Sequence, residues 1–207
     1  MNRPVAIIHL DESCLGNGRV GATPGGAGAL IEVRTAQGLQ RRDVYLNAPD
    51  TTNNRMALRG AIAVLDVLSN KGRRLAGLMV SDSQYLVKGI TEWAPGWKRR
   101  GWRRKGGEIE NLELWQELDL AAGRHDFQWI WVRGHARHAK NEYADHLAQR
   151  AARRQETSDG AVDSGFPVWL VEQRADGHYV DYDPDAEYAA QEREILGGRR
   201  FQRAAGA

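Results

Sequence analysis

Three aspartates and a histidine in this chain have the residue types and placement of a metal-dependent hydrolytic site. Asp11 and Asp82 each follow an apolar run, and Asp145 lies in an expected helix ten residues after His135. Ligands of open α/β sheets bind beyond the carboxyl ends of strands, so Asp11 and Asp82 converge if their strands are parallel neighbours. Carboxylate oxygens suit Mg²⁺, with Mn²⁺ as the alternative ion. Taken singly, each aspartate is more often a cap or turn residue, so spacing alone leaves a hypothesis.

A second cluster combines positive charge with aromatic rings. From Trp93 to Lys105 the chain reads WAPGWKRRGWRRK. Cations neutralise phosphates, and indole rings pack on sugars and bases. A charged run is usually only a solvated face, but three interleaved tryptophans would be costly exposed apolar area without a ligand. The pattern favours nucleic-acid contact through Trp93, Trp97, Lys98, Arg99, Arg100, Trp102, Arg103, Arg104 and Lys105.

The stretch TTNNRMALRGAI, from Thr51 to Ile62, predicts a helix whose start carries more polar groups than a cap requires. Apolar residues recur after it at helical spacing. Two threonines and two asparagines precede them, and Ala57 occupies the first turn. The stretch raises two questions: what the polar cluster binds, and whether a functional side chain is missing at Ala57.

The elements that must position these residues can be read from hydrophobic patterns. Apolar runs predict strands at residues 5–10, 28–35, 43–48, 75–82 and 127–134. The first three suggest an antiparallel meander. Helical patterns follow at residues 52–68, 83–93, 109–123 and 141–154. A meander followed by alternating helices and strands predicts an α/β fold with a mixed sheet covered on both faces.

Composition limits the class of protein. The 207 residues are 42% hydrophobic and 27% charged, which is typical of a globular protein with a substantial core. We find no apolar run long enough for a membrane span and no secretory signal in the first residues. The single cysteine, Cys14, excludes an internal disulfide and favours the cytoplasm.

Charge divides the chain into two parts. Residues 1–154 carry 24 Lys and Arg against 16 Asp and Glu, a net charge of +8, whereas residues 155–207 carry 5 against 11, a net charge of −6. A basic body suggests a polyanionic partner. We expect residues 155–207 to be an acidic extension with a polar linker, a small hairpin over 167–183, a short helix over 185–196 and a disordered end. We also expect this extension to fold back and compete with nucleic acid.

Seven stretches, in order and spacing, resemble those of a type 1 ribonuclease H over about residues 4–154. They are DESCLGN, TTNNRM, SDSQYL, GITEWAPGWKRRGW, LWQELD, VRGHARH and NEYADHLA. The resemblance implies a ribonuclease H-like fold, with a five-stranded mixed sheet of three antiparallel and two parallel strands flanked by helices. It also implies Mg²⁺-dependent endonucleolytic hydrolysis of the RNA strand of RNA–DNA hybrids. No membrane contact or obligate protein partner is evident.

The resemblance also assigns roles to individual residues. Asp11, Asp82 and Asp145 match metal-binding carboxylates, and His135 matches a loop histidine that assists proton transfer or product release. The polar residues Asn17, Asn53 and Gln84 match contacts to the minor groove or sugars of the hybrid, and Thr52 matches a phosphate-pocket residue. The residues that match the handle for the DNA strand are Trp93, Trp97, Lys98, Arg99, Arg100 and Trp102.

Two positions depart from the family pattern. The family places a fourth carboxylate, a glutamate, where this chain has Ala57, and usually a glycine where it has Glu12. Glu12 could supply the lost carboxylate from another direction. Adjacent side chains of an extended strand point to opposite faces, however, so Asp11 and Glu12 should diverge unless the strand ends or bulges there.

Three functions remain open from the sequence. The chain is an active ribonuclease H, or it is a hybrid-binding protein in which catalysis is impaired or lost because of Ala57, or it is a related nuclease with a different substrate. TTNNRM, the DSQ triplet at Asp82 and the tryptophan-rich handle favour hybrid recognition and argue against the third function.

Overall fold

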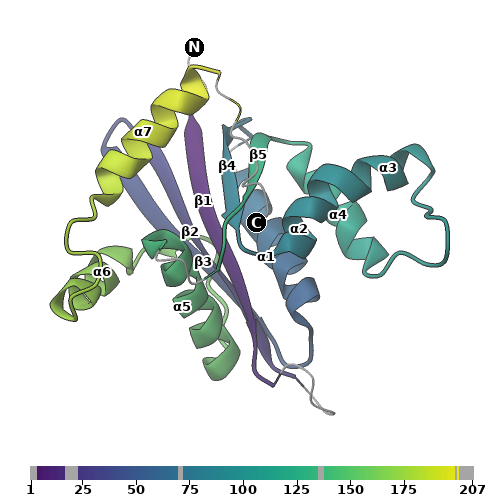
Figure 1. Cartoon of the computed structure of the whole chain (residues 1–207), viewed down its shortest axis with the longest axis horizontal. Helices are drawn as coiled ribbons and strands as arrows, with labels where there is room; N and C mark the ends of the chain where they lie inside the picture. The colour runs from purple at the N-terminus through teal and green to yellow at the C-terminus, as the bar shows by residue number, and fades with distance from the viewer. Residues whose placement is uncertain (1–3, 17–22, 70–71, 135–137, 199, 201–207) are drawn as a thin grey trace.

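The structure is a computed structural model that describes residues 4–16, 23–69, 72–134, 138–198 and 200. A six-stranded sheet with the order β5-β4-β1-β2-β3-β6 forms its centre (Figure 1). Strands β1 and β2 and strands β2 and β3 pair antiparallel, whereas β4 is parallel to both β1 and β5. The strands are β1 (Val5–Cys14), β2 (Gly25–Thr35), β3 (Gly38–Ala48), β4 (Ala76–Ser81), β5 (Asp126–Trp131) and β6 (Val162–Asp163).

Helices cover both faces of the sheet. The helix α1 (Asn53–Ser69) packs on one face together with α4 (Leu112–Ala122), and α5 (Ala139–Arg154) packs on the other. Alternation along β1 explains this division, because Ile8 and Leu10 join the core under α1 while Ile7 points to the opposite face. The remaining helices are α2 (Gln84–Lys88), the π-helical turn η1 (Gly89–Trp93), α3 (Ala94–Arg99), α6 (Phe166–Ala175) and α7 (Pro184–Leu196).

The pairing of β1 with β4 brings two of the predicted site residues together. The strands are parallel, and Leu10 of β1 pairs with Ser81 of β4. Asp11 directly follows Leu10 and Asp82 directly follows Ser81, so both aspartates lie at the same edge of the sheet. The predicted convergence of these two aspartates is therefore confirmed.

Two glycines in β2 let α5 lie unusually close to the sheet. A Cβ atom added at Gly28 would lie 2.5 Å from the backbone nitrogen of Ala148 and 2.6 Å from the carbonyl oxygen of Ala144. A Cβ atom at Gly26 would lie 2.2 Å from the carbonyl oxygen of Ala148. Only glycine permits this approach of helix backbone to strand backbone. It brings α5, which carries Asp145, against the centre of the sheet.

The structure confirms the predicted α/β fold with five strands in a mixed sheet flanked by helices, and it adds a sixth strand. The added strand β6 lies in residues 155–165, which were predicted to be a polar linker. Val162 pairs with Asp43 of β3, and Ser158 donates its hydroxyl to the carbonyl oxygen of Tyr45 at 3.2 Å. The segment is therefore part of the sheet edge.

The hairpin predicted over residues 167–183 is wrong, because α6 occupies its first half. The β-branched and aromatic residues of this stretch suggest a strand. Phe166, Trp169 and Leu170 instead follow helical spacing and are buried together, and Pro167 stands in the first turn, where a helix tolerates proline. The predicted short helix over residues 185–196 is present as α7. The predicted disordered end lies almost wholly outside the described residues.

The acidic extension does fold back, but it does not cover the basic handle. The helices α6 and α7 lie on the α5 side, at the opposite end of the molecule from α3 (Figure 1). Their acidic side chains pair with arginines of the sheet: Glu192 with Arg34 at 2.8 Å and Asp185 with Arg41 at 2.5 Å. Competition of this extension with nucleic acid for the basic body stays a prediction. Within the described residues, every helix is too short or too polar to span a bilayer.

Candidate active site

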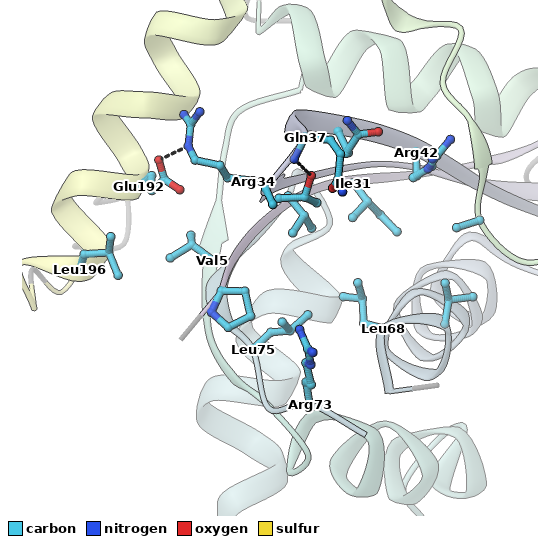
Figure 2. Close-up of a pocket in the computed structure, with 17 residues that line it drawn as sticks. Val5, Ile31, Arg34, Gln37, Arg42, Leu68, Arg73, Leu75, Glu192 and Leu196 are labelled. Carbon is cyan, nitrogen blue, oxygen red and sulfur yellow. Dashed lines mark hydrogen bonds and ion pairs between the residues drawn. The ribbon is translucent and has the colours of Figure 1, made fainter. Parts of the chain in front are cut away.

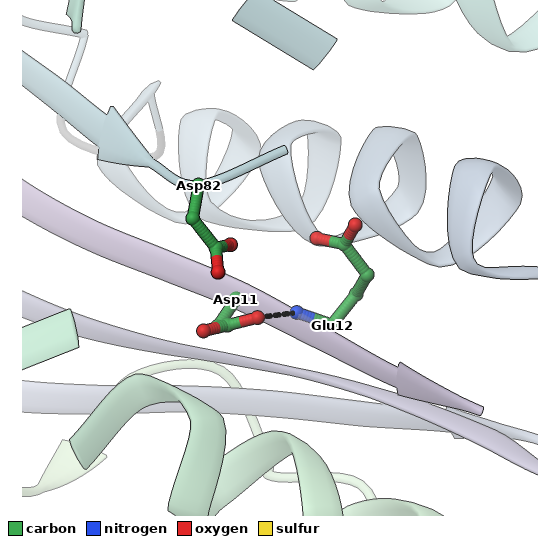
Figure 3. A group of neighbouring side chains, drawn as sticks. All are labelled: Asp11, Glu12 and Asp82. Atoms are coloured by element: carbon green, nitrogen blue, oxygen red, sulfur yellow. Dashed lines mark hydrogen bonds between the residues drawn. The ribbon is translucent and has the colours of Figure 1, made fainter. Parts of the chain in front are cut away.

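Three carboxylates converge where β1 and β4 end. Asp11, Glu12 and Asp82 each offer one oxygen atom, and these atoms all lie within 4.8 Å of one another (Figure 3). The indole nitrogen of Trp131, at the end of β5, donates to the carbonyl oxygen of Asp82 at 2.9 Å and so fixes the backbone there. The edge of the sheet thus concentrates negative charge in a small volume.

Both oxygens of Asp11 are held by hydrogen bonds. The backbone N–H of Glu12 donates to Oδ1 at 2.7 Å, and Nδ2 of Asn141 donates to Oδ2 at 3.1 Å. Asn141 lies in the first turn of α5. The carboxylate is therefore oriented by one strand and one helix.

The electrostatics of the cluster call for a cation. Burial raises the pKa of Asp11 to about 9, and the charges of Asp82, Glu12 and Asp145 add to this rise. Burial and the charge of Asp82 raise the pKa of Glu12 to about 8, although a hydrogen bond with Ser83 acts in the opposite direction. Among the described atoms, Oε2 of Glu12 is buried without a hydrogen-bond partner. Clustered carboxylates with an unsatisfied oxygen fit a hard divalent cation.

The expected divergence of Asp11 and Glu12 is not observed. The two residues do leave opposite sides of β1, because Asp11 meets Asn141 of α5 whereas Glu12 bonds to Ser83. The longer side chain of Glu12 nevertheless returns to the end of the strands, where its carboxylate joins the other two (Figure 3). Strand alternation fixes only where a side chain starts, and two methylene groups are enough to bring this carboxylate back to the edge.

Ala57 is surrounded by apolar side chains at the position where the resemblance predicts a glutamate. It is 0% exposed in the first turns of α1 and packs in the core cluster that includes Leu10 and Leu58. Leu10 and Glu12 lie two residues apart on β1 and therefore share the side that α1 covers. Glu12 thus approaches the cluster from the side of α1, where the family pattern places its glutamate.

Asp145 lies near the three carboxylates without joining their closest grouping. It is half-buried in α5, and Nε2 of Gln149 donates to its Oδ2 at 2.7 Å. Its charge contributes to the raised pKa of Asp11, which places it within electrostatic reach. Two further predicted residues, His135 and Asn17, lie outside the described residues.

The polar residues at the helix starts lie on the side of the sheet that α1 covers. Thr52 is exposed, and its Oγ1 accepts from the backbone N–H of Arg55 at 3.3 Å, so part of the polar cluster is indeed a helix cap. Oδ1 of Asn53 is buried and has no partner among the described atoms. Gln84 begins α2 and is exposed, accepting from Nζ of Lys88 at 2.9 Å.

The basic handle is the stretch Trp93–Lys105, which comprises the last residue of η1, the helix α3 and the turn that follows. All six of its basic side chains are exposed, and Lys98 pairs with Asp119 of α4 at 2.6 Å. The tryptophans are less exposed than the sequence suggests. Trp93 is 37% exposed, whereas Trp97 and Trp102 are half-buried against the core beside α4. The aromatic residues therefore anchor the handle to the body, and the charges form its outer surface.

Sequence reasoning missed Asn141 and Ser83. Asn141 stands four residues before Asp145, so both lie on one face of α5, and this i, i+4 spacing is a signal that could have identified it. Ser83 follows Asp82 directly, but nothing in the local pattern distinguishes it from a helix cap.

The groove in Figure 2 is separate from this site. It has a volume of about 1110 Å³ and lies between the start of β1, the end of α1 and the end of α7. Its lining includes Val5, Leu68, Leu75 and Leu196, with Arg34 among the residues at its side. The carboxylates lie at the other end of β1, so this groove takes no part in their chemistry.

Comparison with known proteins identifies the family. The family model described as RNase H matches residues 3–153. The chain belongs to the ribonuclease H family. The match covers strands β1 to β5 and helices α1 to α5 apart from the last residue of α5, Arg154, and it stops short of the acidic extension.

Curated ribonucleases H share almost their whole length with this chain. The ribonuclease H of Aromatoleum aromaticum is 44% identical over 152 residues, which cover 72% of this chain and 92% of the relative. That of Halorhodospira halophila is 45% identical over 149 residues, covering 72% and 93%. Among solved structures, LC9-RNase H1 is 50% identical with a TM-score of 0.76 and covers 82% of each chain. It is described as a type 1 RNase H with the type 2 active-site motif.

Proposed function

We propose that this ribonuclease H hydrolyses the RNA strand of RNA–DNA hybrids endonucleolytically, with a divalent cation held by Asp11, Glu12, Asp82 and Asp145. The observation that carries the proposal is the grouping of the Asp11, Glu12 and Asp82 oxygens within 4.8 Å. Glu12 thereby takes the place of the carboxylate that Ala57 lacks. The description of LC9-RNase H1, a type 1 enzyme with another active-site motif, supports such a rearrangement.

The chain's own residues perform the binding and orientation. Asn141 and the backbone of Glu12 fix Asp11, and Trp131 fixes the backbone at Asp82. The carboxylates draw Mg²⁺ or Mn²⁺ because their mutual repulsion is relieved only by positive charge. A divalent cation held by these carboxylates would supply Lewis acidity toward the phosphodiester and the attacking water.

The hybrid is recognised by the surface beside the carboxylates. The exposed charges of the handle, including Arg99 and Arg103, suit one strand's phosphates. Thr52 and Gln84 stand at the starts of α1 and α2, where helix termini and polar side chains favour phosphate and sugar oxygens. Asn53 has an unsatisfied buried oxygen that a sugar hydroxyl or a base donor would satisfy.

A cleavage assay tests this proposal. Hybrid, double-stranded RNA and double-stranded DNA are incubated with the protein in Mg²⁺, in Mn²⁺ and in EDTA, alongside the variant Asp11→Asn. We expect cleavage of the RNA strand of the hybrid alone, dependent on the cation and abolished by the substitution. The apolar environment of Ala57 favours the second candidate, a hybrid-binding protein without catalysis. Tight hybrid binding with no cleavage in either metal would establish that candidate instead.

A further inference from the structure

A buried lysine joins the acidic extension to the helix that carries part of the metal site. Lys140 lies in the first turn of α5 and is 1% exposed. Its Nζ lies 2.7 Å from Oε2 of Glu32 in β2 and 3.1 Å from Oε2 of Glu187 in α7. The same ammonium donates to the carbonyl oxygen of Pro184 at 3.1 Å. Two of its three partners thus belong to the segment 155–198, which lies beyond the family match.

Two neighbours of Lys140 are held by the same segment. The hydroxyl of Tyr179 donates to Glu142. The hydroxyl of Tyr143 donates to Oδ2 of Asp43 at 2.6 Å. Asp43 also accepts from Oγ of Ser164 at 2.6 Å and from the backbone N–H of the following glycine at 3.0 Å.

Aromatic packing reinforces these polar contacts. The ring of Tyr143 packs edge-on against Phe166, with centroids 5.3 Å apart, and beside Trp169 at 5.4 Å. Lys140, Glu142 and Tyr143 all belong to the first two turns of α5. The extension therefore contacts the start of this helix at three of four consecutive residues.

The start of α5, which the extension contacts, also contains the residue that orients Asp11. Asn141 follows Lys140 directly, and its Nδ2 donates to Oδ2 of Asp11. Asp145 lies one helical turn further on. A small rotation of α5 about its own axis would move both side chains relative to Asp11. The contacts of Lys140, which point away from the carboxylates toward α7, oppose such a rotation.

The chemistry of the contact suggests positioning rather than stability. Burying an ion pair costs desolvation that its attraction often fails to offset, so apolar residues could hold α7 as firmly. His9 and Gln191 add buried polar atoms without partners among the described residues, and both line the cavity of about 200 Å³ beside Lys140. Compared with apolar packing, the ion pair of Lys140 fixes the position of α5 relative to α7 more narrowly.

We propose that segment 155–198 is a positioning element of the metal site: through Glu187 and Lys140 it fixes the first turn of α5, and so holds Asn141 and Asp145 in register with Asp11. The inference rests on the proposed function, because it assumes that these side chains serve a bound cation. Lys140 and Glu187 touch neither substrate nor metal and act only through α5.

The test compares two substitutions in α7. Glu187→Leu removes the carboxylate that α7 offers to Lys140 and leaves Glu32 and the carbonyl oxygen of Pro184 in place. Tyr188→Phe is the matched control, since its hydroxyl bonds to the carbonyl oxygen of Val5 and the backbone N–H of Arg34, away from α5. Each variant is made in the full chain, its melting temperature is recorded, and Mg²⁺ binding is measured by calorimetry without nucleic acid. We expect Glu187→Leu to weaken Mg²⁺ binding about three- to tenfold, somewhat less than removal of a group that bonds directly to a metal ligand. Tyr188→Phe should lower the melting temperature without weakening Mg²⁺ binding.

A milder variant, Glu187→Gln, keeps the inference testable if Glu187→Leu fails to fold. It retains an oxygen acceptor for Lys140 without the charge, and we expect an intermediate Mg²⁺ affinity. Equal Mg²⁺ affinity in the parent, both Glu187 variants and Tyr188→Phe would overturn the inference while leaving the proposed function intact. Failure of the proposed function gives a different result: the parent itself would bind Mg²⁺ no better than Asp11→Asn.

Discussion

Nδ2 of Asn141 lies 3.1 Å from Oδ2 of Asp11, so one hydrogen bond ties the first turn of α5 to the end of β1. Asn141→Ala should lower kcat/KM for hybrid cleavage about tenfold, the usual scale for losing a group that orients a metal ligand. Asn47→Ala is the matched control, because the same amide is removed at a site on β3 where it bonds to Gln155. Steady-state kinetics with Mg²⁺ compare the two. Equal activity of both variants would show that Asp11 needs no support from α5.

A pair of substitutions tests the proposal that the carboxylate of Glu12 serves in place of a glutamate at position 57. Glu12→Gln keeps the shape of the side chain but removes its charge, so cleavage should fall at least about tenfold, or ~1.4 kcal/mol of barrier. Ala57→Glu alone should add no activity. It should also lower stability, because it places a charge in a fully buried apolar position.

A double variant shows whether carboxylates at positions 12 and 57 can substitute for each other. In the background of Glu12→Gly, Ala57→Glu should restore part of the lost activity, because a carboxylate then returns from the neighbouring α1. Activity with both Mg²⁺ and Mn²⁺ is the measurement. If Ala57→Glu alone raised the rate of the parent markedly, Glu12 would not be the substitute, and the site would be an impaired one.

Removing charge from the cluster should stabilise the protein in EDTA at alkaline pH. The pKa of Asp11 rises on folding to about 9, and that of Glu12 to about 8, chiefly because of burial. Between their unfolded values near 4 and these folded values, the folded state holds protons that the unfolded state has lost. The free energy of unfolding therefore falls as pH rises through this window.

Asp11→Asn removes this dependence at one position. At pH 8 its free energy of unfolding should exceed that of the parent by at least about 1 kcal/mol, and at pH 4 the two should be nearly equal. Urea denaturation at both pH values in EDTA measures the difference. Adding Mg²⁺ should stabilise the parent but not the variant, since only the parent retains the full ligand set. A difference that is the same at pH 4 and pH 8 would rule out this origin.

The sequence predicted the strands and the aspartates well for physical reasons. Continuous apolar runs such as residues 5–10 and 75–82 have few alternatives to a buried strand, and a carboxylate at the end of each must lie at the sheet edge. The parallel pairing of β1 with β4 then brings Asp11 and Asp82 together. These conclusions need only local pattern and the topology it allows.

What the sequence could not supply depends on side-chain reach and on distant contacts. Alternation correctly places Glu12 on the other side of β1 from Asp11 but says nothing about where a longer side chain ends. The strand-like composition of residues 166–175 is overridden because Phe166 and Trp169 pack against Tyr143, a contact between distant parts of the chain. Half-burial of Trp97 likewise follows from Trp115 in α4, which no local pattern reveals.

The charges of the handle should carry the salt dependence of hybrid binding. Arg99, Arg103 and Arg104 are exposed side chains of the handle. Replacing all three with alanine should weaken binding and reduce the slope of log K against log salt by up to about 2–3, close to one for each phosphate that the variant no longer neutralises. Binding titrations at several salt concentrations in EDTA measure this. The control replaces Arg153 and Arg154, two basic residues at the end of α5. An equal change in slope for this control would show that the handle contributes no more to hybrid binding than other basic residues.

Gly28 should be needed for Mg²⁺ binding because it sets the distance between β2 and α5. A Cβ atom at this position would lie 2.5 Å from the backbone nitrogen of Ala148, so Gly28→Ala must push α5 away from the sheet. Overpacking of this kind costs about 1–3 kcal/mol of stability. Asn141 and Asp145 move with the helix, so Mg²⁺ affinity should fall even at temperatures where the variant is fully folded.

Gly123→Ala is the control. Gly123 is exposed after α4, its φ is an ordinary −61°, and an added Cβ atom would have its nearest contact at 3.3 Å. Calorimetric Mg²⁺ binding at about 15 °C, close to the temperature of maximum stability of many domains, compares the two variants, with folding verified by circular dichroism. A fully folded Gly28→Ala that binds Mg²⁺ as the parent does would show that the metal site tolerates a displaced α5.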